Sequence, residues 1–340
     1  MTHMRAPICV VKNVTANYVA GPGPVVQAVD DVSLTIHHGE VLGIAGESGC
    51  GKSTLAAIMS MTARPPLIVR DGEMIVEGEK IELKYQTRAP VEWHGQVVSL
   101  LPQRSLNSLN PTAKVSDFVV DVVRGHDATI SPKQAIDLAR ERLDIVSLPP
   151  RVLDSYPHQL SGGMRQRVVA VISTLLNPTV LIADEPTSAL DVSSQKQLVM
   201  LLQLLLEREF IRCIAFITHD LPMLSNIAHR IAVMYAGNIV EIGATEQIVE
   251  SPEHPYTKAL ITSTLDPDPR VRGRQLSGLP GAPPDLRYPP LGCRFHPRCP
   301  FVMDVCKAGP VPAVGDENHF AVCHWVAQQA QPMRFHEVDQ

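Results

Sequence analysis

The sequence has 340 residues, of which 45% are hydrophobic and 19% are charged, with a formal net charge of -5. This length predicts one large domain with an appendage, or two domains. The negative charge argues against a nucleic-acid partner, and no apolar run approaches the roughly 18–20 residues of a membrane-spanning helix. The first residues, MTHMRAPICV, lack the pattern of a secretory signal, so we expect a soluble, cytoplasmic chain that reaches a membrane only through partners.

Up to about residue 250, short apolar runs alternate with longer segments of helical pattern. Residues 8–36 show short alternating runs that predict an antiparallel β layer, and residues 72–98 predict a second small β region. The runs Val41–Gly46, Val180–Asp184 and Cys213–Asp220 are bounded by turn residues and indicate buried strands of a largely parallel sheet.

The segments between these strands are long enough for helices. Residues 195–208 predict one helix, and a polar, helix-prone insert is expected over about residues 116–143. This alternation of strands and helices predicts an α/β fold. After Ser251, prolines become frequent and the helical pattern fades. This indicates a linker and then a small, loop-rich module that needs a cross-link or a bound metal ion to stay folded.

Residues 46–54 read GESGCGKST, between a strand-like VLGIA and a helix-like LAAIMSM, and match the phosphate-loop pattern in its required context. The glycines let backbone N–H groups point at phosphates, and the following helix adds its positive N-terminal end. Lys52 is expected to reach the β- and γ-phosphates, and Ser53 to ligate Mg²⁺. The alternative is a glycine-rich turn with an accidental lysine. The predicted nucleotide-binding residues here are Gly46, Glu47, Ser48, Gly49, Cys50, Gly51, Lys52, Ser53 and Thr54.

A second anion-binding helix start is predicted in residues 160–167, which read LSGGMRQR and precede a helical run. The phosphate loop already holds the phosphates of one nucleotide. We therefore expect Ser161, Gly162 and Gly163, with Gln166 in the same block, to complete the nucleotide site of another subunit. The alternative is an ordinary helix capped by serine.

Residues 180–185 read VLIADE, an apolar strand that ends in two carboxylates. Asp184 is suited to bind Mg²⁺, directly or through water. Glu185 is suited to act as the general base for the attacking water. His219 ends another strand, where it either contacts the γ-phosphate or has a structural role. Gln103 follows the strand-like VVSLL and is expected to sense Mg²⁺ or the water.

In this order, these blocks resemble the nucleotide-binding subunit of ATP-binding cassette (ABC) transporters over about residues 8–243. The resemblance implies an ABC-type P-loop ATPase domain over residues 1–250. It would have a RecA-like parallel core, an antiparallel β layer and a helical subdomain at about residues 104–176. It also implies that Tyr18 stacks on adenine.

In this family two cassettes dimerise head to tail. The resemblance therefore implies that each ATP lies between the phosphate loop of one subunit and Ser161–Gly163 of the other. It further implies that Gln103 and the segment after it couple the ATPase to membrane subunits.

The blocks HPYTKAL at residues 254–260 and GCRFHPRCP at residues 292–300 resemble the C-terminal extension of the oligopeptide/dipeptide/nickel importer branch. This implies an extension over residues 251–340 and an ATPase that powers uptake of di- or oligopeptides at the cytoplasmic face of the inner membrane. The implied partners are two membrane permease subunits, a second ATPase subunit, either related or identical, and, indirectly, an extracytoplasmic solute-binding protein. Nickel chelates, glutathione and sugars remain open as substrates.

A different class, a soluble cassette ATPase acting on nucleic acid or ribosomes, would show coiled-coil insertions, tandem cassettes or a strong basic patch. The sequence shows none of these.

Four cysteines lie in the proline-rich region: Cys293, Cys299, Cys306 and Cys323. In a reducing compartment such a group favours metal binding over disulfides, and four thiolates suit a [4Fe–4S] cluster or structural zinc. The absence of a closely spaced cysteine pair favours the iron–sulfur cluster, although His296, His319 or His324 could replace a ligand in a zinc site. The third possibility is four reduced cysteines packed as small hydrophobic groups.

Overall fold

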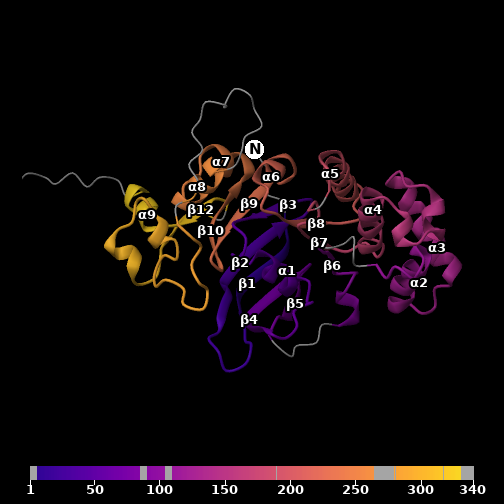
Figure 1. Ribbon diagram of the computed structural model, residues 1–340, viewed down its shortest axis with the longest axis horizontal. Helices are drawn as coiled ribbons and strands as arrows, with labels where there is room; N and C mark the ends of the chain where they lie inside the picture. The colour runs from indigo at the N-terminus through magenta and orange to yellow at the C-terminus, as the bar shows by residue number, and fades with distance from the viewer. Residues whose placement is uncertain are drawn as a thin grey trace, which may run out of the picture.

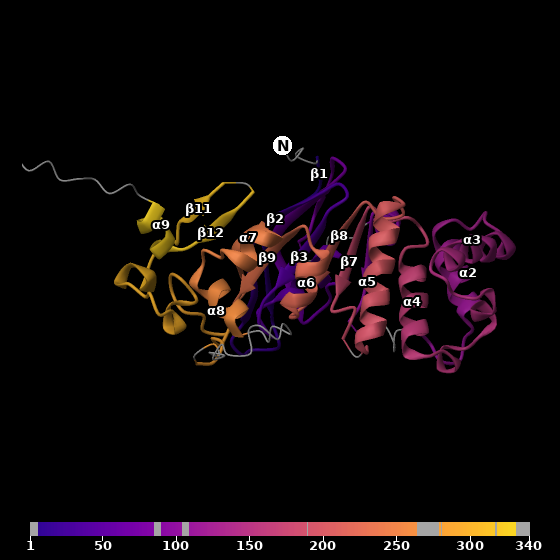
Figure 2. The ribbon, with the colours of Figure 1, turned by 90° about the horizontal axis from the view of Figure 1, so that it is seen from above.

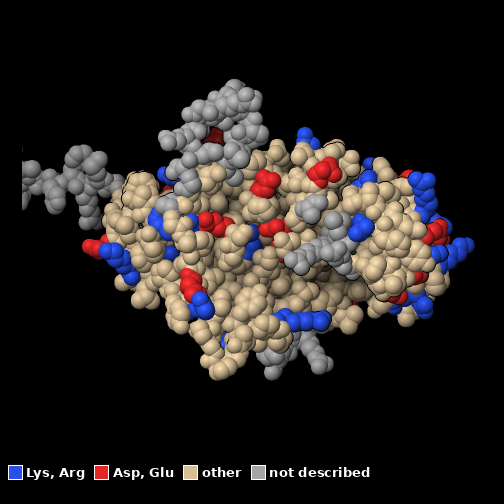
Figure 3. Space-filling view, in the orientation of Figure 1, with Lys and Arg blue, Asp and Glu red and all other residues tan. Residues whose placement is uncertain are grey.

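The computed structural model describes residues 6–84, 90–103, 109–188, 190–263, 279, 281–316 and 318–330. The molecule is elongated, with helices at one end, the C-terminal segment at the other end and β-sheets between them (Figures 1 and 2). On the face seen in Figure 3, side chains of both charges are interspersed and gather most densely over the helical end. Within the described ranges, no helix is long and apolar enough to span a membrane.

The antiparallel β layer predicted near the N-terminus is present as a four-stranded sheet of order β2-β1-β4-β5. Its strands are β1 (Pro7–Tyr18), β2 (Val26–His37), β4 (Leu67–Val76) and β5 (Glu79–Glu82). Buried and exposed residues largely alternate along β2 and β4, as expected where one face of a sheet meets a core.

The larger sheet has eight strands in the order β11-β12-β10-β9-β3-β8-β7-β6, and its five strands from β9 to β6 are parallel. These are β3 (Val41–Ala45), β6 (Val98–Leu101), β7 (Val180–Asp184), β8 (Cys213–Ile217) and β9 (Arg230–Tyr235). The remaining strands are antiparallel: β10 (Asn238–Ala244), β11 (Ala313–Gly315) and β12 (Phe320–Val322). The predicted parallel core is therefore confirmed, with an antiparallel edge.

Every residue of β3, β7 and β8 is buried, because both faces of this sheet are covered. Side chains alternate between the faces of a strand. Leu42 and Ile44 of β3 belong to the core shared with the β layer, whereas Val41 and Ala45 belong to the core under the helices. The parallel strands thus form the centre of a layered structure whose strand ends carry the loops of the site.

The helices are α1 (Lys52–Met59), α2 (Val115–His126), α3 (Pro132–Ile145), α4 (Gly162–Ser173), α5 (Val192–Glu207), α6 (Leu221–Ile227), α7 (Thr245–Glu250), α8 (Pro255–Ser263) and α9 (His324–Ala330). The predicted insert over residues 116–143 consists of α2 and α3, which form the far helical end (Figure 1). Ser131 separates them as the N-cap of α3. Its hydroxyl accepts from the Gln134 N–H, and the Gln134 side chain accepts from the Ser131 N–H.

The C-terminal extension continues the central sheet, because β12 pairs with β10 through Glu241 opposite Ala321 and Ile242 opposite Phe320. The fully buried Glu241 carboxylate accepts hydrogen bonds from the backbone N–H groups of Glu253 and His254. A division of the chain at residue 250 into an ATPase domain and an extension remains a proposal. In the structure, the two parts share one sheet.

Candidate functional site

The predicted phosphate loop, residues 46–51, connects β3 to α1. Gly46 (φ 154°) and Gly51 (φ 110°) lie against backbone, since a Cβ would come 2.2 Å from the carbonyl oxygen of Met234 at Gly46 and of Ala28 at Gly51. Gly49 has φ 81° and open space around the position of a Cβ. Two glycines therefore let the loop pack closely, and the third leaves its outer side clear for a ligand.

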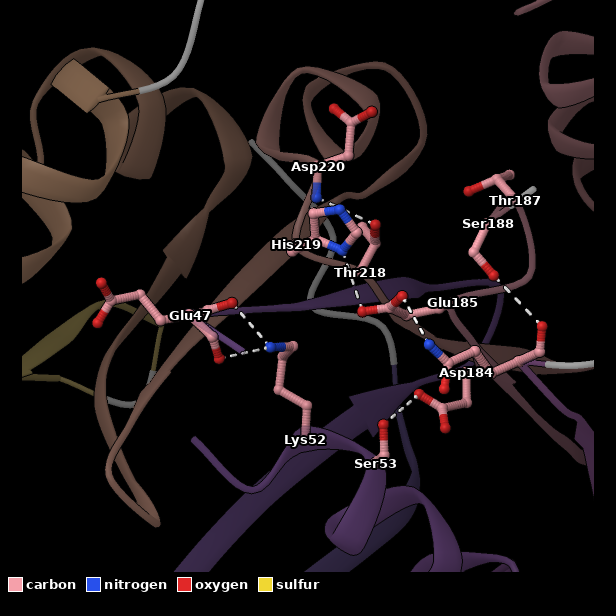
Figure 4. Close-up of polar contacts among 12 residues, drawn as sticks. Glu47, Lys52, Ser53, Asp184, Glu185, Thr187, Ser188, Thr218, His219 and Asp220 are labelled. Carbon is pink, nitrogen blue, oxygen red and sulfur yellow. Dashed lines mark hydrogen bonds and ion pairs between the residues drawn. The ribbon is translucent and has the colours of Figure 1, made fainter. Parts of the chain in front are cut away.

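Lys52 lies in the curve of this loop. Its Nζ donates hydrogen bonds to the carbonyl oxygens of Gly46 at 2.7 Å and Glu47 at 2.9 Å, and its side chain is buried (Figure 4). This ammonium has no carboxylate partner among the contacts of the described residues. The arrangement fits a phosphate group, which would supply the missing negative charge at the N-terminus of α1.

Asp184 and Ser53 meet at the end of β7, where Ser53 Oγ donates to Asp184 Oδ1 at 3.0 Å. Burial raises the pKa of the Asp184 carboxyl, the Ser53 hydrogen bond lowers it, and the neighbouring Glu185 carboxylate raises it. A cation beside this carboxylate would stabilise its charged form. One carboxylate and one hydroxyl next to a phosphate loop are the donor set that Mg²⁺ takes when it binds with nucleotide phosphates.

Glu185 lies directly after β7, between Gln103 and His219. Gln103 Nε2 donates to Glu185 Oε2 at 3.0 Å, and His219 Nδ1 lies 3.0 Å from Glu185 Oε1, within hydrogen-bond distance (Figure 4). The His219 side chain is 62% exposed and that of Glu185 is 15% exposed. The structure therefore brings together the three residues that were predicted to be catalytic.

The backbone at Glu185 has φ 43°, in the left-handed region that a residue with a side chain rarely adopts. Its N–H donates to the Ile217 carbonyl oxygen at 2.8 Å, so the chain still follows β8 at this point. Ser188 Oγ then donates to the Gln103 carbonyl oxygen at 3.3 Å. Strain of this kind persists only where the surroundings hold it, and it is common at functional sites.

Tyr18, predicted to stack on adenine, ends β1 beside the phosphate-loop helix. Its hydroxyl lies 3.1 Å from Thr54 Oγ1, and either group can donate. Cys50 is buried inside the loop, and burial raises the pKa of its thiol. Ser48 is exposed. Tyr18 therefore lies close enough to border a nucleotide held by the loop, while its contact with adenine stays a prediction.

Ser161 is the N-cap of α4, and its hydroxyl accepts from the Met164 N–H at 3.3 Å. Ser161 and Gly162 are exposed, and a Cβ added to Gly162 would meet no atom within 4 Å. Gln166 is instead buried, and its Nε2 donates to the Pro186 carbonyl oxygen at 2.5 Å. The helix α4, which Ser161 caps, lies apart from α1 in Figure 1.

Tyr256 and Arg298 were not predicted to belong to this site, although both contact Glu47 of the phosphate loop. Their only signal in the sequence was membership of the blocks HPYTKAL and GCRFHPRCP. Residues 104–108, which include most of the segment expected to follow Gln103 as a coupling element, lie outside the described residues.

The prediction of a metal-binding C-terminal extension, with a [4Fe–4S] cluster or zinc, is not supported. Over the ranges that the structure describes, no group of three or more His, Cys, Asp or Glu side chains could hold a metal ion. The thiols of Cys293, Cys299, Cys306 and Cys323 are all free.

Three of these thiols have raised pKa values. Burial raises the pKa of Cys293 to about 11, with smaller contributions from the other three cysteines, and it also raises the pKa of Cys299 and Cys323. The histidines considered as replacements have other contacts, since His296 Nδ1 bonds the Cys293 carbonyl and His319 Nε2 bonds Glu241. The reading as small hydrophobic groups fits this packing.

Comparisons with known proteins agree with the order of these blocks. A family model described as ABC transporter matches residues 29–188, and one described as oligopeptide/dipeptide transporter, C-terminal region, matches residues 240–306. The dipeptide transport ATP-binding protein DppD of Caldanaerobacter subterraneus subsp. tengcongensis is 40% identical over 87% of this chain and 90% of its own length. The oligopeptide transport ATP-binding protein OppD of Bacillus subtilis is 40% identical over 91% of this chain and 86% of its own length.

A solved structure, the dimeric post-hydrolysis state of the ATP-binding cassette MJ0796 bound to ADP and Pi, is similar with a TM-score of 0.60. It is 25% identical and covers 70% of this chain and 99% of its own chain. This fold, with a phosphate loop and two carboxylates at the end of β7, is thus found in a chain that resembles transport ATP-binding proteins along most of their length. The chain belongs to the ABC transporter family, in the oligopeptide/dipeptide branch of its ATP-binding proteins.

Proposed function

We propose that this chain is the ATP-hydrolysing subunit of an importer for di- or oligopeptides. Its relatives include a dipeptide and an oligopeptide transport ATP-binding protein, and these names and the match to the peptide-transporter C-terminal region support this substrate class. The partners in this proposal are two membrane permeases and a second ATPase subunit at the cytoplasmic face of the inner membrane, with an extracytoplasmic solute-binding protein that delivers the peptide.

The phosphate loop is the proposed site for the β- and γ-phosphates, with Lys52 directed to them. Ser53 and Asp184 would hold Mg²⁺, since their oxygens already lie 3.0 Å apart at the end of β7. When bound, Mg²⁺ neutralises the charge that develops on the phosphates during their transfer. The roles of these residues are supported by the close packing of the loop and by the burial of Asp184.

The observation that carries the catalytic proposal is the position of Glu185 between Gln103 and His219. Glu185 would take a proton from the attacking water, whose oxygen bonds to the γ-phosphorus as the bond to the β-phosphate oxygen breaks. Gln103 and His219 hold the two carboxylate oxygens of Glu185, so they would orient the base and lie near the γ-phosphate.

Ser161, Gly162 and Gly163 would complete the nucleotide site of the second ATPase subunit. The exposure of Ser161 and Gly162 and the open space around Gly162 support this role, as does the likeness to a dimeric cassette with ADP and Pi. ATP held between two subunits would join them, and hydrolysis would release them.

The proposed function is tested by reconstituting the chain with its permeases, the second ATPase and the solute-binding protein in liposomes. We expect ATP-dependent accumulation of a labelled peptide. We expect none when Glu185 of this chain and the equivalent residue of the second ATPase subunit are both glutamine. Accumulation of a nickel chelate or a sugar, but of no peptide, would contradict the substrate class and leave the ATPase role intact.

A further inference from the structure

The C-terminal extension reaches the phosphate loop directly, through Glu47. The Tyr256 hydroxyl accepts a hydrogen bond from the Glu47 backbone N–H at 2.9 Å. Arg298 holds the Glu47 carboxylate through both of its terminal nitrogens, with one at 2.7 Å from Oε2 and the other at 3.0 Å from Oε1. A two-point contact of this kind fixes direction as well as distance.

Glu47 thereby connects the extension with the lysine of the phosphate loop. Its carbonyl oxygen accepts from Lys52 Nζ at 2.9 Å, while its carboxylate points away from Lys52 (Figure 4). The backbone N–H, the carbonyl and the carboxylate of Glu47 therefore all have partners. The Glu47 N–H therefore joins the phosphate loop to the extension through Tyr256.

The groups that hold Glu47 are themselves fixed in a buried aromatic cluster of Tyr235, Tyr256 and Phe295. The ring of Tyr256 is fully buried and lies 4.5 Å from the ring of Tyr235 and 5.4 Å from that of Phe295, between centroids. The Tyr235 hydroxyl also accepts from Arg298 at 3.3 Å. Burial raises the pKa of Tyr256, so its hydroxyl stays protonated.

The start of α8, which carries Tyr256, is anchored to the central sheet. His254 and Glu253 donate their backbone N–H groups to the buried Glu241 carboxylate on β10. The Tyr256 N–H in turn donates to His254 Nδ1 at 3.0 Å. A continuous series of hydrogen bonds thus leads from β10 to Glu47.

A phosphate loop binds ATP through several backbone N–H groups that must converge on one ligand. When ATP binds, the loop loses any conformational freedom that it has in the empty state, and this loss of entropy weakens ATP binding. A contact that already holds the loop in its binding shape reduces this entropic cost. We propose that Tyr256 and Arg298 of the C-terminal extension are positioning residues for the nucleotide site, which hold Glu47 so that the phosphate loop keeps its ATP-binding shape. This inference rests on the proposed ATP site.

The test is an equilibrium titration of the purified full-length chain with a fluorescent ATP analogue and Mg²⁺, together with thermal unfolding without nucleotide. Tyr256→Phe removes only the hydroxyl that accepts from Glu47 and keeps the ring in its cluster. We expect it to weaken ATP binding by roughly tenfold, as loss of a buried hydrogen bond does. Tyr288→Phe is the matched control, because Tyr288 lies in the same extension and is 71% exposed, and it should leave the affinity unchanged.

The second pair is Arg298→Gln with Arg287→Gln as its control, since Arg287 is exposed and pairs with Asp285 in the extension. Arg298→Gln should weaken ATP binding in the wild-type background and have little further effect when Glu47 is already glutamine, because the two residues act through one contact. In transport-coupled hydrolysis, KM for ATP should rise while kcat is retained. If Arg298 only stabilised the fold, the Arg298→Gln variant would unfold at a lower temperature, and its folded form would bind ATP as tightly as wild type.

The proposal is overturned if Tyr256→Phe binds the analogue as tightly as Tyr288→Phe does. It is also overturned if Arg298→Gln weakens binding equally with Glu47 present and replaced. If Arg298→Gln does not fold, the comparison of the two tyrosine variants decides. Failure of the wild-type chain to bind the analogue would instead count against the proposed ATP site.

Discussion

Ser53 and Asp184 are 131 positions apart in the sequence, yet the Ser53 hydroxyl donates to the Asp184 carboxylate at 3.0 Å. Ser53 lies in the first turn of α1 and Asp184 ends β7, and these elements meet at the carboxyl ends of the parallel strands. In open α/β sheets, ligands bind at this edge. The pair thus marks where Mg²⁺ would join the phosphates, and it defines the first test of the site.

Asp184→Asn should weaken activation by Mg²⁺ by roughly tenfold or more, since an amide oxygen carries no charge to offset that of the ion. ATP hydrolysis measured against Mg²⁺ concentration gives this shift. Asp137→Asn changes an exposed carboxylate on α3 and serves as the control. An unchanged Mg²⁺ dependence in Asp184→Asn would refute the metal role of this residue.

Acidification should weaken the same step, because burial raises the pKa of Asp184 and a protonated carboxyl is a poor Mg²⁺ ligand. As the pH falls towards this raised pKa, more Mg²⁺ should be needed for half-maximal hydrolysis. Excess Mg²⁺ should restore part of the lost activity, which separates proton competition from unfolding. The Mg²⁺ requirement of Asp184→Asn should change less over the same pH range.

Glu185→Gln should bind ATP but lose turnover by roughly 10²- to 10⁴-fold, the usual contribution of a general base. Glutamine keeps an oxygen that can accept from Gln103 Nε2, so the local geometry should survive. Binding is measured by equilibrium titration and turnover by phosphate release. Glu246→Gln, at an exposed position in α7, is the control. Turnover near that of the control would exclude Glu185 as the base.

Gly162→Arg should separate the two halves of the nucleotide site. The position is open in the single chain, so ATP binding to that chain should stay within about twofold of wild type. In the dimer, the arginine would be an unpaired charge buried between subunits. Such a charge is costly, so turnover should fall by roughly tenfold or more. Gly125→Arg is a matched control, because Gly125 is also exposed and has open space around its Cβ position on α2. Loss of ATP binding by the single chain would instead place Gly162 in its own subunit's site.

Local patterns in the sequence predicted the elements that carry the site. The run Val180–Asp184 is β7 with the predicted bounds, and the helix predicted over residues 195–208 is α5, which begins earlier because Asp191 caps it. Gln103, Glu185 and His219 were each placed at a strand end, and parallel strands bring such ends together.

Contacts that depend on tertiary packing could not be predicted in this way. Tyr256 and Arg298 meet Glu47 across 209 and 251 positions, and no local period encodes that meeting. Gln166 was grouped with the nucleotide-binding residues by its block, but the turn of α4 points it inward to Pro186. The spacing of the four cysteines likewise does not determine how their side chains are placed, and among the described residues no group of three or more His, Cys, Asp or Glu could hold a metal ion.

His254 should make the stability of the fold depend on pH. Burial lowers the pKa of His254 to about 3, from an ordinary value of 6.5. Below pH 6.5 the unfolded chain therefore takes up a proton that the folded chain does not. On account of this one group, the free energy of unfolding should fall as the pH falls below 6.5, on the order of 1 kcal/mol for each pH unit.

His254→Asn should remove this part of the slope while its side-chain oxygen keeps an acceptor for the Tyr256 N–H. Urea unfolding at several pH values from about 7 to about 5 measures the difference, over a range in which most carboxylates stay ionised. His158→Asn changes an exposed ring and should leave the slope as in wild type. Because other groups titrate in both proteins, the decisive quantity is the difference between the two variants. Equal slopes would show that His254 is accessible to protons in the folded chain.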